Sequence, residues 1–339
     1  MRSAADRIHS RQTRAWLSRT APVMMGILVF ALGLVVAPTA GAQEPPLKLL
    51  LDTDIGADID DEMTLIYLLN SPEIDLRGVT TVHGNPCSRA DSARAIIDVI
   101  ERSGEVPVYA GAAKKLAQQP GMTDASRFIV QSLREANGPR NIVVTGAYTN
   151  VARAVQEEPK LARSRLETIY LMGFSLATMS TLHNATNDLQ ATGILLKSGI
   201  PLRVLPAEIG WECQMTQEEY DEILASEAPQ IVHIKQRMMN WVKRVRTRPS
   251  NPIPDYLPRP YDTLAAMTIK NPELFQWKRG TIEIVSSGGK LTFIESPNKL
   301  HEIVVGVDRE KAMALHHHRL LAWPGTLTTA NSFPPGFNL

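Results

Sequence analysis

The sequence has little of several features that would mark a specialised class of protein. It holds only two cysteines, Cys87 and Cys213, among 339 residues, so it can form no more than one internal disulfide. It shows no internal repeat and no low-complexity linker. Its one proline-rich stretch, residues 249–260, lies between helix-like segments, and we expect an ordered surface loop or lid there. These absences favour a single large domain over a string of small ones.

The chain also lacks an excess of positive charge. Lysine and arginine together number 36, and aspartate and glutamate number 35. A nucleic-acid-binding domain usually shows a clear basic excess, so the composition gives no indication of a nucleic-acid partner.

Long apolar runs are missing except near the N-terminus, at residues 21–37. This run follows five arginines and precedes the small residues PTAGA, a pattern that predicts a secretory signal peptide cleaved after Ala42. An uncleaved N-terminal anchor is the alternative. Without residues 1–42 the chain would carry 31 basic and 34 acidic side chains, a formal charge of −3. We therefore expect a secreted or periplasmic protein without stable membrane insertion, in a compartment that permits a Cys87–Cys213 disulfide.

Short apolar runs alternate with segments of helical pattern along the rest of the chain. This rhythm predicts an α/β fold with a mostly parallel, doubly wound sheet. The predicted parallel strands lie at residues 47–54, 74–82, 106–111, 141–147, 166–173 and 201–206. Further expectations are helices at residues 216–243, 262–270 and 309–321, and a hairpin at residues 281–296.

An unusual density of carboxylates follows the first predicted strand. Within ten residues of the apolar run Leu49–Leu51 the sequence places five aspartates, which are Asp52, Asp54, Asp58, Asp60 and Asp61. Ligands of open α/β sheets bind at the C-terminal ends of strands, and repulsion among so many carboxylates is relieved by a cation. Helix capping is the alternative, but capping needs only one side chain. The cluster therefore predicts a site for a hard divalent metal.

Other polar residues stand at the ends of later strands. His83 and Asn85 close the second strand, Thr149 and Asn150 follow the fourth, and a polar loop with Asn184 follows the fifth. Each could be a turn or capping residue, as could Asp262 at the start of an apolar helix. Together they define one rim rich in oxygen ligands and amides. Three consecutive histidines, residues 316–318, cannot share a helix face, so we expect a solvated stretch there and no zinc site.

In chain order, these segments resemble the nucleoside hydrolase family, the inosine/uridine-preferring nucleoside N-ribohydrolases. The family's opening signature, DTDxG, a spacer and DD, appears as DTDIG-ADI-DD, with Ile55 for the common proline and a spacer two residues longer. Further matches are HGN at residues 83–85, GAYTNVARA, HNATNDLQA, SGIPLRVLP and YDTLAAMTIKNPELF. The resemblance covers nearly the whole chain after residue 42.

The resemblance implies a single-domain, nucleoside-hydrolase-like (Rossmann-like) fold over residues 43–339. It implies calcium-dependent hydrolysis of the N-glycosidic bond of ribonucleosides, giving ribose and free base, in a homodimer or homotetramer. The implied Ca²⁺ ligands are Asp52, Asp61, the backbone carbonyl of Thr149, and Asp262. Asp52 would also be the general base that takes a proton from a water activated by the metal. Asp60, Asn85 and Asn184 would bind the ribose hydroxyls, and His83 is a further candidate substrate contact in the HGN match.

The chain departs from the family pattern at three positions. Leu182 replaces a glutamate that helps to hold the ribose, and Phe174 replaces the second glycine of a GG motif. Tyr261 replaces the histidine before the last metal aspartate, which makes it the candidate catalytic contact to the leaving group. A phenol is a poorer proton donor than imidazolium at neutral pH, so pyrimidine or atypical ribosides become plausible substrates.

Two other functions fit parts of the sequence. A phosphohydrolase of the haloacid dehalogenase type also begins with an apolar strand and DxD, and would use Asp54 as an acid beside Mg²⁺. It leaves the Asp60–Asp61 pair and the YDTLA segment unexplained. A non-catalytic nucleoside- or ribose-binding homologue would keep the scaffold and metal but lose turnover, and the three departures favour it.

Overall fold

A ten-stranded sheet forms the centre of the computed structural model, which describes residues 44–248, 254–286 and 288–337. The strand order is β3-β2-β1-β4-β5-β7-β10-β8-β9, and the two-residue strand β6 pairs with β5. The first seven strands of that order run parallel, whereas β8, β9 and β6 pair antiparallel with their neighbours. The strands are β1 Leu47–Thr53, β2 Ile74–Thr81, β3 Val108–Ala110, β4 Asn141–Val144, β5 Thr168–Ser175, β6 Ser180–Thr181, β7 Leu202–Pro206, β8 Phe275–Ile284, β9 Leu291–Glu295 and β10 His301–Val307. The predicted mostly parallel α/β sheet is confirmed.

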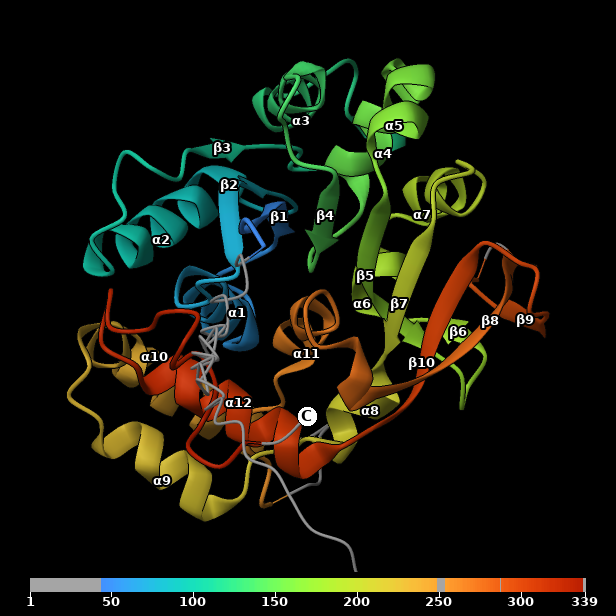
Figure 1. Ribbon diagram of the computed structural model, residues 1–339. Coiled ribbons are helices and arrows are strands. Elements are labelled where there is room, and N and C mark those ends of the chain that lie inside the picture. The colour runs from blue at the N-terminus through green and yellow to red at the C-terminus, as the bar shows by residue number, and fades with distance from the viewer. Residues whose placement is uncertain (1–43, 249–253, 287, 338–339) are drawn as a thin grey trace, which may run out of the picture. The chain divides into compact units, whose positions relative to one another are not determined.

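Helices cover both faces of this sheet (Figure 1). They are α1 Asp60–Leu69, α2 Pro86–Val99, α3 Asp124–Arg134, α4 Thr149–Glu157, α5 Pro159–Arg165, α6 His183–Asn187, α7 Leu189–Leu196, α8 Ala207–Glu212, α9 Gln217–Ala225, α10 Pro229–Arg246, α11 Tyr261–Met267 and α12 Arg309–Leu321. Short 3₁₀ turns occupy Leu116–Gln118 and Pro272–Leu274.

Strand β1 shows why an unbroken apolar run forms a central parallel strand. Leu49 and Leu51 pack into the core on the face of α1, α2, α10, α11 and α12, whereas Leu50 packs with α3, α4 and α7 on the other face. Successive strand side chains point to opposite faces, so a strand buried on both faces needs apolar residues at every position. Because β1 lies between β2 and β4, the residues that follow it emerge at the middle of the sheet edge.

The secondary structure predicted from the sequence needs correction at two places. The helix predicted over residues 216–243 is in fact two helices, since α9 ends at Ala225 and α10 begins at Pro229. Proline is tolerated at the first position of a helix because the backbone N–H there has no partner within the helix. Strand β10 was not expected. The hairpin of β8 and β9 forms as predicted, although Ser287 lies outside the described residues. The proposed loop at residues 249–260 is described only from residue 254 onward, where Leu257 is buried.

The histidine triplet is not a solvated stretch, because it lies within α12. His316 is fully buried, and neither of its ring nitrogens has a hydrogen-bond partner among the described residues. Burial lowers its pKa well below the usual range, so the ring is neutral. His317 is also buried and contacts the carbonyl of Met313 at 2.8 Å through Nδ1.

Both cysteines are free. Cys87 is exposed and Cys213 is buried, so the structure contains no Cys87–Cys213 disulfide. None of the helices in the described part of the chain has the length and apolar character needed to cross a membrane. The predicted signal peptide, residues 1–42, lies outside the described residues.

Candidate active site

Asp52 lies at the buried end of β1 and is fully inaccessible to solvent. Parallel pairing places it opposite Thr80 of β2, whose hydroxyl donates to Asp52 Oδ1 at 2.6 Å. Asn150 Nδ2 donates to the same oxygen at 2.8 Å. Burial raises the pKa of Asp52 from 3.8 to about 7, although both donors oppose this by favouring the ionised form. The second oxygen, Oδ2, is buried and has no hydrogen-bond partner within the described protein.

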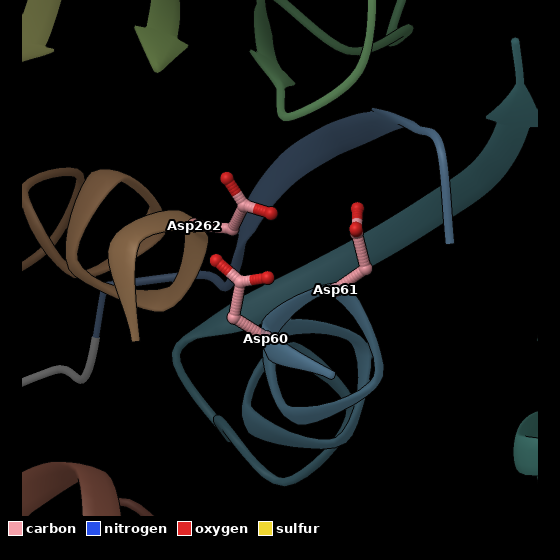
Figure 2. Close-up of side chains that lie close together, drawn as sticks. All are labelled: Asp60, Asp61 and Asp262. Atoms are coloured by element: carbon pink, nitrogen blue, oxygen red, sulfur yellow. The ribbon is translucent and has the colours of Figure 1, made fainter. Parts of the chain in front are cut away.

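Three more carboxylates gather nearby, from the first turns of α1 and α11 (Figure 2). Asp60, Asp61 and Asp262 are all buried, and one oxygen of each lies within 4.8 Å of the others. Their pKa values are raised well above the usual range, first by burial and then by repulsion from neighbouring aspartates. Carboxylates placed this closely are stabilised by protons or by a bound cation.

The polypeptide holds the two helix ends together through threonines. Thr64 of α1 and Thr263 of α11 lie in hydrogen-bonding contact at 3.0 Å. Thr145 follows β4 and links the two parts of the site, since its N–H donates to the Asp52 carbonyl at 2.8 Å and its hydroxyl donates to Asp61 Oδ1 at 3.1 Å. Thr53 donates a short hydrogen bond to the same Asp61 oxygen. Both threonine hydroxyls contact the same oxygen of Asp61, Oδ1.

The carboxylate set fits a hard divalent cation. The site offers three clustered carboxylates and a buried, unpartnered oxygen on Asp52. An orphaned buried acceptor is costly unless a ligand satisfies it, and oxygen donors are what such cations prefer.

The amide and threonine residues predicted for the site reach the same sheet edge. Asn184 is buried in α6 and its Nδ2 donates to the carbonyls of Thr145 at 2.5 Å and Met172 at 3.3 Å. Thr149 begins α4, and its hydroxyl donates to Asp188 Oδ2 at 2.7 Å, which fixes the first turn of that helix. Asn184 is thus linked to Asp52 through Thr145, and Thr149 directly precedes Asn150, which donates to Asp52.

His83 and Asn85 lie on the turn between β2 and α2. His83 adopts a left-handed backbone conformation, φ 67°, which non-glycine residues rarely hold without support. Asn85 is exposed, and its side chain accepts from the N–H of Ser88 at 3.2 Å as the N-cap of α2. The amide of Asn85 therefore has a structural task here, and its contact with the ribose remains a prediction.

Tyr261 is the first residue of α11 and directly precedes Asp262. Its ring packs against Gly210 of α8, where an added Cβ would lie only 2.0 Å from Tyr261 Cδ1. Arg259 donates to its hydroxyl at 3.2 Å. Burial raises the phenol's pKa beyond its usual range, so Tyr261 stays protonated at neutral pH.

The other two departures lie in apolar surroundings. Phe174 is fully buried, with its ring 6.3 Å from that of Tyr148. Leu182 precedes α6 and packs against the core. Neither side chain can donate or accept a hydrogen bond, so any polar contact at these two positions must come from elsewhere.

The residues that orient Asp52 were not predicted from the sequence. Thr80 contacts it from β2 and Asn150 from the first turn of α4, and Asn150 also donates to the Thr81 carbonyl at 3.0 Å and accepts from Ala112 N–H at 2.9 Å. Asn150 was noted only as half of a Thr-Asn pair that could start a helix. The signal lay in its place one residue after a predicted metal ligand.

Comparison with known proteins decides the assignment. The family model described as inosine-uridine preferring nucleoside hydrolase matches residues 49–314. The chain belongs to this family.

Relatives with assigned names are distant. A probable uridine nucleosidase 1 of Oryza sativa subsp. japonica is 25% identical over 273 residues, covering 71% of this chain and 82% of the relative. A pyrimidine-specific ribonucleoside hydrolase RihA of Shewanella sp. (strain MR-4) is 28% identical over 211 residues, covering 53% and 65%.

Solved structures share the fold. The plant nucleoside hydrolase PpNRh1 superposes with a TM-score of 0.71 at 21% identity, covering 82% of this chain and 100% of that one. A purine-preferring ribonucleoside hydrolase from Gardnerella vaginalis gives 0.68 at 22% identity, covering 80% and 98%. The single open α/β domain of this nucleoside hydrolase is therefore the family's architecture, and the chain is a hydrolase acting on N-glycosyl bonds of ribonucleosides. The family assignment excludes the phosphohydrolase alternative. Asp54, the acid in that alternative, lies 3.9 Å from the guanidinium of Arg89.

Proposed function

We propose that this protein hydrolyses ribonucleosides to ribose and free base in a calcium-dependent reaction, with Asp52 as general base. The observation that carries the proposal is the buried Asp52 carboxylate with its unpartnered Oδ2, joined through Thr145 to the Asp60, Asp61 and Asp262 cluster.

Asp61, Asp262, Asp52 and the Thr149 carbonyl would hold the cation, and Asp60 would bind a ribose hydroxyl or join the ligands. A divalent cation supplies Lewis acidity, which lowers the pKa of a water that it holds. Oδ2 of Asp52 is the unpartnered oxygen, so it would accept the proton as water adds to the anomeric carbon and the C–N bond breaks. The carboxylates also stabilise positive charge that develops on the sugar.

The leaving base must receive a proton or a hydrogen bond. Tyr261 is protonated, and its hydroxyl would donate a hydrogen bond to the leaving base. Some leaving bases are already stable as they depart, and others must be fully protonated. A hydrogen bond from a phenol assists the first kind more than the second. Asn184 and Asn85 would hold the ribose hydroxyls, while the side chains of Leu182 and Phe174 give the sugar no polar contact.

The test is a ribose-release assay on purine, pyrimidine and modified ribonucleosides, with calcium and with EDTA. We expect turnover with calcium, loss of turnover in EDTA, and loss in Asp52→Asn. The panel needs both base classes, because the named relatives include uridine and pyrimidine hydrolases and a purine-preferring structure. Calcium binding without turnover of any nucleoside would favour a non-catalytic binding protein.

We also propose export and self-association. A mature N-terminus at Gln43, measured by mass spectrometry of the protein from its native host, supports cleavage after Ala42; an intact N-terminus contradicts it.

Light scattering at micromolar concentration should give the mass of a homodimer or homotetramer, and a monomer mass contradicts this expectation.

A further inference from the structure

Arg89 joins two loops that border the candidate site. It lies in α2, and its guanidinium contacts three groups. Its Nε donates to the carbonyl of His83 at 2.7 Å, and one terminal nitrogen donates to the carbonyl of Ile55 at 2.8 Å. The other terminal nitrogen lies 3.9 Å from Asp54 Oδ2. Ile55 and Asp54 belong to the acidic loop, residues 54–59 between β1 and α1, whereas His83 belongs to the turn between β2 and α2.

The contacts need the shape of arginine. A guanidinium is a planar fork with five N–H donors, so it can donate to two carbonyls and face a carboxylate at once. A lysine ammonium is a point charge and does not reproduce this arrangement. The Arg89 side chain is only 13% exposed, so water replaces these donors poorly when they are removed.

Both loops need such support. His83 and Gly84 have consecutive positive φ values, 67° and 68°, and the histidine pays a conformational cost for it. In the acidic loop, Gly56 has a left-handed backbone conformation, φ 102°. Ile59 is the N-cap residue of α1, and its side chain makes no capping hydrogen bond. Further side-chain contacts to the loop come from Thr53, whose hydroxyl accepts from the Ile55 N–H at 3.0 Å, and from Arg244, which donates to the Ala57 carbonyl at 3.3 Å from an exposed position.

The acidic loop leads straight into the carboxylate cluster. Asp60 and Asp61 are the first two residues of α1, so the end of the loop sets where both carboxylates lie. The loop carboxylates Asp54 and Asp58 repel each other and those of Asp60 and Asp61, and Arg89 places a cation beside Asp54. Among the charged contacts to this loop, Arg89 is the one that also reaches the His83–Asn85 turn, so its loss would weaken the contact between the two loops.

We propose that Arg89 is a positioning residue, a clamp that fixes the acidic loop against the His83–Asn85 turn and thereby sets Asp60 and Asp61 for the metal and the ribose. The clamp itself is a property of the loops, whereas its effect on calcium and substrate rests on the proposed function. Arg89 touches neither substrate nor metal in this account.

The experiment compares Arg89→Lys and Arg89→Gln with the matched pair Arg77→Lys and Arg77→Gln. Arg77 is an arginine of β2 whose side chain is 43% exposed and contacts Asp75. Calorimetric titration of calcium should show about 10- to 100-fold weaker binding in both Arg89 variants, as expected for lost hydrogen bonds from a charged group. The KM for a cleaved nucleoside should rise with it, and both Arg77 variants should match the wild type.

Hydrogen exchange of the metal-free proteins tests the clamp without calcium or turnover. Amides at residues 54–60 and 83–85 should exchange faster in the Arg89 variants, while those in β4 and β5 stay as in the wild type. Arg89→Lys keeps the charge and most of the stem, so it remains informative where Arg89→Gln fails to fold. Unchanged exchange in both segments, or equal effects in the Arg77 variants, overturns the proposal. If the wild type neither binds calcium nor cleaves nucleosides, the proposed function fails, and the exchange data still decide whether Arg89 clamps the loops.

Discussion

Removal of one hydroxyl should move the pH dependence of activity in a defined direction. Thr80→Val keeps the shape of the side chain and deletes the group that donates to Asp52 Oδ1 at 2.6 Å. Thr80 is almost fully buried and its other neighbour is the Leu51 carbonyl at 3.4 Å, so little else changes. The donor favours the ionised carboxylate, and its loss makes Asp52 hold its proton more tightly.

The size of the effect follows from the charge on the acceptor. A hydrogen bond to a charged group contributes about 1.5–3 kcal/mol, and about 1.4 kcal/mol corresponds to one pH unit. In a profile of kcat/KM against pH, the acid limb reports the base in the free enzyme. We expect this limb to lie about one to two pH units higher in Thr80→Val than in the wild type.

A matched control separates this effect from loss of a buried hydroxyl in general. Thr268→Val removes a buried hydroxyl that donates to the Ala265 carbonyl at 2.6 Å and contacts no carboxylate. Its acid limb should coincide with that of the wild type. A Thr80→Val limb at the wild-type pH would refute the role of Asp52 as the titrating base, and a shift to lower pH would refute the sign of the argument.

Three further predictions concern the cluster and the core. Asp262→Asn should weaken calcium binding more than about 100-fold by calorimetry, since even residues behind metal ligands contribute 10- to 100-fold; unchanged affinity would remove it from the ligands. Gly210→Ala should lower the free energy of unfolding in urea by about 1–3 kcal/mol, because its methyl group would overlap the Tyr261 ring; equal stability would contradict this packing. His316→Leu should gain stability relative to the wild type as pH falls below 6.5, by up to about 1.4 kcal/mol per pH unit. The sign follows because the folded wild type keeps His316 neutral while the unfolded chain binds the proton; a constant difference between pH 7.5 and 5 would contradict it.

The sequence predicted the sheet and the acidic turn because both depend on local patterns. An unbroken apolar run such as Leu49–Leu51 is typical of a parallel strand that helices cover on both faces. Carboxylates that follow such a strand must lie at its C-terminal edge, and other strands bring Thr149 and Asn184 to the same edge. The approach of Asp262 to Asp60 and Asp61 also agrees with the order of the family motifs.

Other features depend on contacts between distant residues, which no local pattern carries. The donors to Asp52, Thr80 and Asn150, lie 28 and 98 residues away along the chain. The clamp by Arg89 reaches 34 residues back to Ile55. His316 has a polar side chain, which favours a prediction of solvent exposure. The packing of α12 against the rest of the protein buries it instead.

The proposed cleavage of ribonucleosides requires both the buried Asp52 carboxylate and a calcium ion held by the carboxylate cluster. The most direct measurement is ribose release from a panel of purine and pyrimidine nucleosides by the wild type and Asp52→Asn, each in calcium and in EDTA. We expect release only by the calcium-loaded wild type, with Asp52→Asn folded and inactive. Release that persists in EDTA or in Asp52→Asn would contradict this requirement.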